Sequence, residues 1–128
     1  MKKRIVALSL ALVFVLMTAS IGLANVGPQS VSGFSSISAS GKTVSYQAQT
    51  SSTTVEPKIT VSVTLKRLVG SQWQLVDSTS ASKQNSTSAV TWDSCNVTGG
   101  YYYKAFATHT STSGGIWSSE SNQLWVPK

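Results

Sequence analysis

The chain of 128 residues holds ten Lys or Arg, four Asp or Glu and a single Cys, and its formal net charge is +6. Three of the basic residues lie at positions 2–4, so the remainder carries seven basic groups against four acidic ones, a net charge of +3. These charges are scattered and form no basic stripe, so we expect no nucleic-acid partner. A single Cys excludes an internal disulfide.

The N-terminus has the order that is typical of a secretory signal peptide. A basic start, Lys2–Arg4, precedes an apolar run, Ile5–Met17, and small or polar residues follow up to Ala24. The apolar run has thirteen residues, whereas a transmembrane helix needs roughly 20. We therefore expect a signal peptide over residues 1–24, cleavage after its last residue, and secretion of residues 25–128 as one domain without a stable membrane anchor.

Alternating apolar and polar residues predict the first strands, because alternation places every second side chain on one face. A weak strand over Gly33–Ala39 precedes a turn at Gly41-Lys42 and a second strand over Val44–Ala48. The polar stretch Thr50–Pro57 is predicted to connect this strand to the strongest one, Ile59–Leu65. In that strand branched apolar residues alternate with Ser and Thr, which suits a half-buried sheet.

A turn at Val69–Gln72 and a strand over Trp73–Val76 complete a predicted hairpin with the strongest strand. Residues Asp77–Ser88 are almost entirely polar and are predicted as a loop, or as the ends of two strands with hydroxylated faces. Beyond them the pattern predicts three further strands, at Val90–Trp92, Tyr101–His109 and Glu120–Val126.

No segment after Gly27 carries apolar residues at helical spacing over ten residues. Six to seven short strands separated by turn signals, in about 100 residues, are typical of a β-sandwich or a small barrel. We therefore predict an all-β fold, a single antiparallel β-sandwich that follows a cleaved signal peptide.

The segment Thr98–Ala107, where a Gly-containing turn leads into alternating inward positions, is similar to the penultimate strand of immunoglobulin-like and fibronectin type III-like sandwiches. The hairpin Ile59–Val76, with Trp73 after Gly70, resembles their central hairpin. More narrowly, both segments resemble small exported proteins of Gram-positive bacteria whose function is uncharacterised. The resemblance implies a tyrosine corner formed by one of Tyr101–Tyr103, although the paired cysteines of antibody domains are missing.

The residues give little support to catalysis or metal binding, so we expect a non-enzymatic protein without a cofactor. Each of the four carboxylates lies beside a predicted turn or strand end, where a solvated surface group is the simplest interpretation. Cys95 and His109 flank a strand of roughly 20 Å, too long for a nucleophile and its base to meet. One His and one Cys cannot build a zinc site. We expect Cys95 to be a buried small hydrophobe, with an intermolecular disulfide or a reactive thiol as alternatives.

Aromatic residues are the remaining functional signal. Tyr102 and Phe106 share the face of their strand that is opposite the apolar one, and Trp117 in the next loop is predicted to extend it. We therefore predict that Tyr102, Phe106 and Trp117 bind an unidentified extracellular macromolecule, a protein or a glycan. The alternative is a secreted toxin, bacteriocin-like protein or protease inhibitor. The oligomeric state stays open, because an exposed edge strand offers unpaired backbone groups to a second copy.

Overall fold

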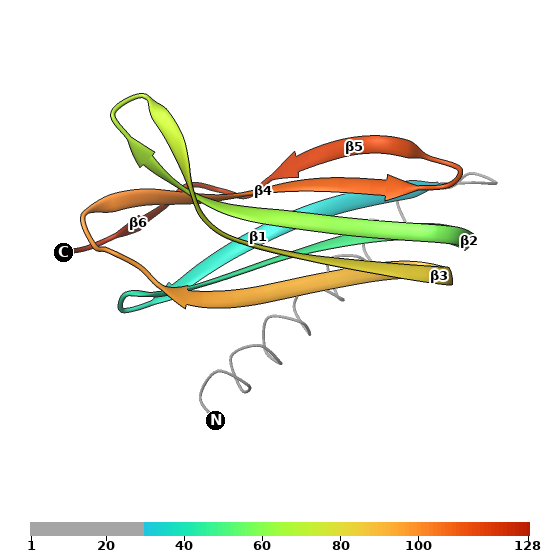
Figure 1. The fold of residues 1–128 in the computed structure, drawn as a ribbon, viewed down its shortest axis with the longest axis horizontal. Coiled ribbons are helices and arrows are strands. Elements are labelled where there is room, and N and C mark those ends of the chain that lie inside the picture. The colour runs from blue at the N-terminus through green and yellow to red at the C-terminus, as the bar shows by residue number, and fades with distance from the viewer. Residues whose placement is uncertain (1–29) are drawn as a thin grey trace.

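Two strands of 27 and 25 residues, β2 (Thr43–Val69) and β3 (Gln72–Asn96), organise the fold. The computed structural model describes residues 30–128, so the predicted signal peptide and its cleavage site lie outside the described residues. In this part of the chain all regular elements are antiparallel strands, and no helix could span a membrane (Figure 1). The other strands are β1 (Val31–Ser40), β4 (Tyr101–Ser111), β5 (Gly115–Glu120) and β6 (Leu124–Val126).

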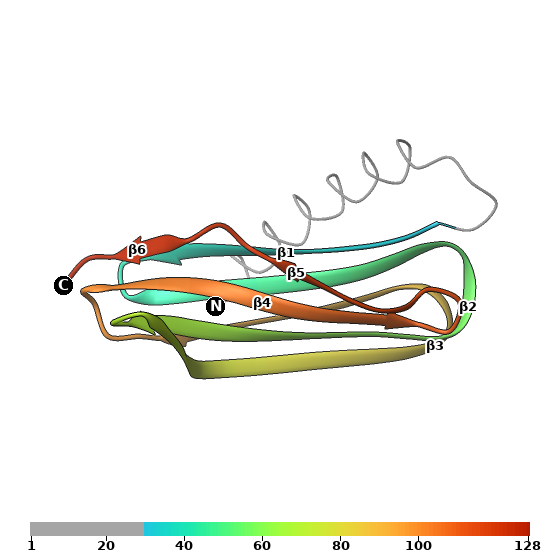
Figure 2. The same cartoon turned by 90° about the horizontal axis from the view of Figure 1, so that it is seen from above.

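Strands β2 and β3 form one long hairpin, which turns at Gly70-Ser71 as the sequence predicts. Gly70 has a φ of 63°, a left-handed conformation that glycine adopts without steric cost. The register between the two strands shifts between Ser51 and Glu56, and there the whole hairpin folds over on itself (Figure 2). Each long strand therefore runs through both layers of the molecule and contributes one strand of ordinary length to each layer.

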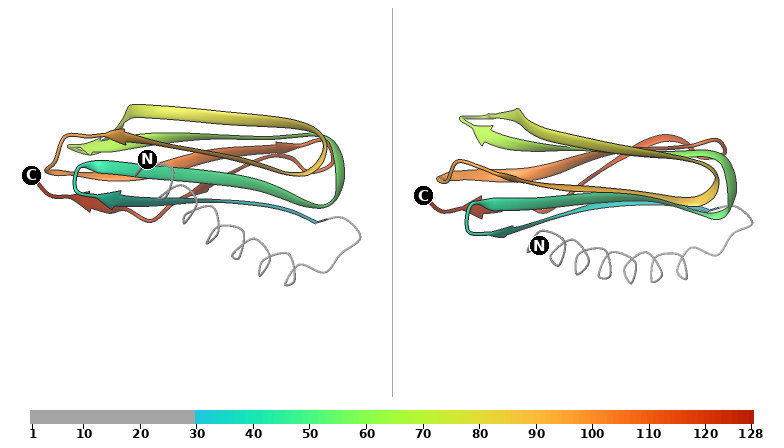
Figure 3. Two further views of the ribbon diagram at one scale, coloured as in Figure 1. Left: turned by 90° about the horizontal axis from the view of Figure 1, so that it is seen from below. Right: turned by 60° about the horizontal axis from the view of Figure 1, so that its bottom comes forward.

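The first layer consists of β1, residues 43–52 of β2 and residues 88–96 of β3. The second layer consists of residues 72–86 of β3, residues 56–69 of β2, and β4, with β5 and β6 both paired to β4. Figure 3 shows the two layers stacked along the length of the long hairpin. This arrangement is a two-layer antiparallel β-sandwich of six strands and confirms the predicted fold class.

The core lies between the layers and is built from the alternate residues that the sequence pattern marks as inward. On β4 these are the odd-numbered residues from Tyr103 to Ala107, and on β2 they include the apolar face of Ile59–Leu65. Cys95 is half-buried and packs against the core, as a small hydrophobe would. The fully buried apolar residues are Val44, Tyr46, Ala48, Ile59, Val61, Val63, Leu65, Ala89, Tyr103, Ala105, Ala107 and Val126.

Two polar segments belong to strands: one was predicted as a connection, and the other as a loop or as strand ends with hydroxylated faces. The prediction of a connection at Thr50–Pro57 is wrong, because β2 continues through it with only the register shift. Residues Asp77–Ser88 lie within β3, and most of them pair with β2. Ser78, Ser80 and Ser82 face solvent, whereas the Thr79 hydroxyl points between the layers. The backbone hydrogen bonds to β2 hold the strand without an apolar pattern.

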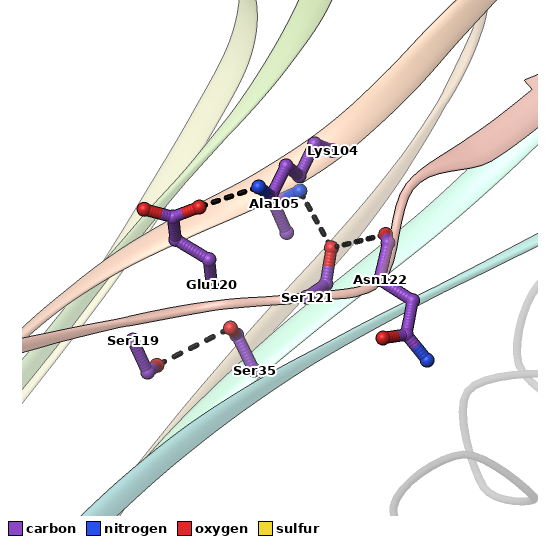
Figure 4. A network of polar contacts seen from close by, with 7 residues as sticks. All are labelled: Ser35, Lys104, Ala105, Ser119, Glu120, Ser121 and Asn122. Atoms are coloured by element: carbon purple, nitrogen blue, oxygen red, sulfur yellow. Dashed lines mark hydrogen bonds and ion pairs between the residues drawn. The ribbon is translucent and has the colours of Figure 1, made fainter.

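The predicted last strand, Glu120–Val126, is divided into the end of β5 and the separate strand β6. Ser121 lies at the division. Its backbone N–H donates to the Ala105 carbonyl at 2.9 Å. Its Oγ accepts from the Ala105 N–H at 2.8 Å, as Figure 4 shows. A side-chain oxygen thus replaces a backbone carbonyl in the ladder. β5 and β6 consequently occupy successive stretches of the same edge of β4.

Candidate binding site

The outward face of β4 carries Tyr102, Lys104 and Phe106, as expected from their alternation with the buried residues. Strand register brings further side chains to this face, because directly opposite residues of paired strands share a face. Trp125 of β6 lies opposite Tyr102, and Glu120 of β5 lies opposite Phe106. The outward side of the second layer is therefore a composite of several strands.

Four aromatic side chains form two ring pairs on this surface, which we call the aromatic face: Trp73, Tyr102, Phe106 and Trp125. The Trp73 and Phe106 rings meet edge to face, with their centroids 5.5 Å apart and their planes at 69°. The Tyr102 and Trp125 rings are 4.9 Å apart and tilted by 58°. Both pairs have the geometry that attractive aromatic contacts favour, so the rings hold one another in place.

Two lysines lie among these rings. The Lys66 ammonium is 5.0 Å from the centre of the Phe106 ring. The Lys104 ammonium is 5.4 Å from the Phe106 ring and 5.8 Å from the Trp73 ring. Lys104 also forms an ion pair of 2.5 Å with Glu120, drawn in Figure 4. Cation–π attraction thus holds positive charge beside the rings of Phe106 and Trp73.

Solvent reaches much of the aromatic face. Trp125 is 48% exposed, Tyr102 is 41% exposed, and the neighbouring Leu75 is 68% exposed. Trp73 and Phe106 are half-buried by their mutual contact and by the lysine stems. Single exposed apolar residues are common on proteins, whereas a contiguous group of large ones marks an interaction surface.

The structure places Tyr102 and Phe106 together on this face but not Trp117. Trp117 lies opposite His109 on the inner side of the second layer, where the two rings stack with centroids 5.6 Å apart. The half-buried Trp117 ring therefore covers an edge of the core. Sequence reasoning could not assign its face, because that depends on the register that the Gly114-Gly115 turn imposes on β5.

Sequence reasoning also left Trp73 and Trp125 out of the candidate site. Trp125 carried a usable signal, since it alternates with two apolar neighbours and so had to point away from them. Trp73 carried no such signal, because a register shift beside Leu65 changes which residues of β3 face outward near the turn. Only after that shift do Lys66 and Leu75 lie opposite one another on the aromatic face.

Buried polar groups elsewhere are engaged in contacts that hold the fold. His109 Nδ1 lies 2.8 Å from Thr50 Oγ1, and His109 Nε2 lies 2.8 Å from Ser119 Oγ. Burial lowers the pKa of His109 to about 4, so the ring is neutral at pH 7. The Thr50 hydroxyl donates to the Thr60 carbonyl, so it accepts from Nδ1–H of His109.

The tyrosine corner implied by the family resemblance is formed by Tyr103. Its hydroxyl donates to the Thr98 carbonyl, five residues earlier, at 2.5 Å. Cys95 lies opposite Val44 in the first layer, whereas His109 lies opposite Val61 in the second. Within residues 30–128 no three His, Cys, Asp or Glu side chains are grouped so that they could hold a metal ion.

No known protein family and no curated protein matches this sequence. Among solved structures, the chain is similar to R. palustris CsgH, with 9% identity over 71% of this chain and 90% of that chain, and a TM-score of 0.48. It is similar to the CARDB domain of the PF1109 protein from Pyrococcus furiosus, with 11% identity over 73% of this chain and 87% of that chain, and a TM-score of 0.45. The chain is also similar to the E. coli curli protein CsgC, with 13% identity over 74% of this chain and 98% of that chain, and a TM-score of 0.42. A likeness at this level assigns neither a family nor a function to the chain.

Proposed function

We propose that this protein is a secreted, non-enzymatic binding module that contacts an extracellular protein through the aromatic face. The observation that carries the proposal is a pair of ring contacts on one outward surface, one of them between the exposed Tyr102 and Trp125, with two lysines beside them. Trp and Tyr dominate the binding energy of protein interfaces, because they bury large area at little cost in conformational entropy. The lysines favour a partner with an acidic surface.

Two further observations support the proposal. The order of residues 1–24 fits export, which would place the domain outside the cell. Carboxylates that could serve as acids or bases are committed to internal contacts: Glu56 accepts from Ser113, Asp77 accepts from Tyr46, and Glu120 pairs with Lys104. A binding role needs none of these groups to be free.

The test is capture of partners from the native extracellular fluid, comparing the wild-type protein with the double variant Tyr102→Ala, Trp125→Ala. We expect the double variant to lose at least about tenfold in recovered partner, because exposed aromatic anchors commonly contribute 1 to 2 kcal/mol each. The matched control is Trp92→Ala, which removes a ring of similar exposure, 42%, from the first layer.

Three outcomes would contradict the proposal. Equal recovery by the wild-type protein and the double variant would show that the aromatic face is not the contact surface. Binding to an array of glycans, with no protein captured, would replace the protein partner by a carbohydrate. Leakage from lipid vesicles or inhibited growth of neighbouring cells would favour a toxin.

A further inference from the structure

The outermost strand of both layers is β3, and one of its edges is open. Among the described residues β3 pairs with β2 alone, along residues 72–96. On the other side of the sandwich β1 packs near β4, β5 and β6, so that side is covered. Figures 1 and 2 show β3 running along the border of the molecule with no strand beyond it. An open strand edge presents unpaired N–H and C=O groups that another strand can bind.

The open edge has little of the protection that natural sheets use. Residues 77–84 of β3 contain one acidic and one basic residue, Asp77 and Lys83, and the others are Ser, Thr, Ala or Gln. They include no Pro, and the strand is long. Edges are normally blunted by several charges, by Pro or by brevity. An unprotected strand edge of this composition is prone to pair with another chain.

The same segment is regular and held rigid by its own protein. It is bounded by the register shift before Asp77 and by Asn85, whose φ of 51° departs from strand geometry. The Tyr46 hydroxyl donates to Asp77 at 2.7 Å, and the Thr79 and Thr91 hydroxyls lie 2.8 Å apart across the two layers. Because the edge is already ordered, a partner strand would lose little conformational entropy by pairing with it.

We propose that residues 77–83 of β3 pair antiparallel with the same residues of a second copy, about a two-fold axis at Ser80. This register places Asp77 of each copy opposite Lys83 of the other, and symmetry forms that opposite-charge pair twice. Moving the axis to Asp77 or to Lys83 would instead set like charges against each other. The segment that this register uses lies wholly within the regular part of the edge.

The other residues that this register pairs have small side chains. Ser78 of one copy meets Ser82 of the other, and Thr79 meets Ala81, so the backbones can approach without steric conflict. The two second layers become one continuous sheet, and their outward faces point to the same side. The dimer would then display two aromatic faces together, which would increase avidity for a repetitive partner surface. The pairing itself does not depend on the proposed function.

The register is tested by placing single cysteines on the outward side of β3. Under mild oxidation Ser80→Cys should form a disulfide dimer, because the two introduced thiols would be opposite each other. Ser78→Cys and Ser82→Cys should each remain unlinked alone and should link when mixed with one another. The wild-type protein, which keeps Cys95, is the control for linkage through the native thiol. Equal linkage of all three variants alone, or linkage of none, would overturn the proposal.

A second test uses charge and does not require a cross-link. Lys83→Asp places Asp opposite Asp77 twice in the dimer, so the dimer dissociation constant measured by sedimentation should rise at least about tenfold. Lys58→Asp is the matched control, because Lys58 is an exposed lysine of the neighbouring strand β2. A wild-type protein that stays monomeric at millimolar concentration, or equal effects of the two substitutions, would contradict the proposal.

Discussion

The ring of His109 lies between the two layers and has no exposed surface. It contacts β2 through Thr50 and β5 through Ser119, while Trp117 stacks on it. A Cβ built at Gly33 of β1 would lie 2.4 Å from the ring, so this glycine leaves the space that the ring occupies. His109 thus joins all four strands that meet at this part of the sandwich.

His109 makes stability depend on pH. Its pKa is about 4 in the folded protein against 6.5 for an ordinary His, so the folded state binds fewer protons between these values. The free energy of unfolding should be unaffected above pH 6.5 and should fall by roughly 2 to 3 kcal/mol between pH 7 and pH 4.5. Urea unfolding at the two pH values measures this loss. In His109→Gln the same comparison should show little change, and an equal slope in both proteins would contradict this role.

Tyr103 is the residue whose hydroxyl makes the corner bond to Thr98. Tyr103→Phe removes the hydroxyl that donates to the Thr98 carbonyl, so the unfolding free energy should drop by about 1 kcal/mol. Thermal or urea unfolding would detect that loss. Tyr102→Phe is the control, since its ring is partly exposed on the outward face, and it should change stability by less than about 0.5 kcal/mol.

At the scale of elements, the bend of the long hairpin is fastened by Glu56. This buried carboxylate accepts from the Ser113 N–H at 2.8 Å and from the Ser113 hydroxyl at 2.7 Å. These bonds hold the β4–β5 turn against the point where β2 crosses between layers. They also lower the pKa of Glu56, the backbone bond from Ser113 most of all, so this stabilisation is lost only as pH falls through that lowered pKa.

Glu56→Ala should therefore lower the unfolding temperature and speed hydrogen exchange at the Ser113 amide, because the bond that protects it is removed. Exchange measured by NMR or mass spectrometry separates this local effect from general destabilisation. Glu120→Ala removes an exposed carboxylate that pairs with Lys104, and it should leave Ser113 exchange unchanged. Slow exchange at Ser113 in the Glu56 variant would show that the turn is held by other contacts.

Alternating residues were sufficient to predict individual strands such as Ile59–Leu65 and Tyr101–His109, since burial on one face leaves that pattern. The polar half of β3 left no such pattern, because its pairing depends on backbone hydrogen bonds and on the adjacent β2. The division of the hairpin between two layers was also beyond prediction. It depends on a local register shift near Ser51, which no single residue type marks.

For the whole molecule, the two sides of the second layer differ in composition and exposure. Its inner face builds a dense core from Val, Ile, Leu, Ala and Tyr without any disulfide. Its outer face carries two ring pairs that lie outside the core. The sequence predicted Tyr102 and Phe106 for that face, because the alternation of inward and outward residues along one strand can be read from the sequence. The contributions of Trp73 and Trp125 required strand register, which is set by the complete fold.

We propose that the exposed rings of Tyr102 and Trp125 serve contact with a partner and not folding. Urea unfolding of the double variant Tyr102→Ala, Trp125→Ala tests it most directly. We predict a loss of less than about 1 kcal/mol relative to the wild-type protein, because substitutions at exposed positions change stability little. A loss of about 3 kcal/mol or more, as expected for removal of a core aromatic side chain, would contradict the claim.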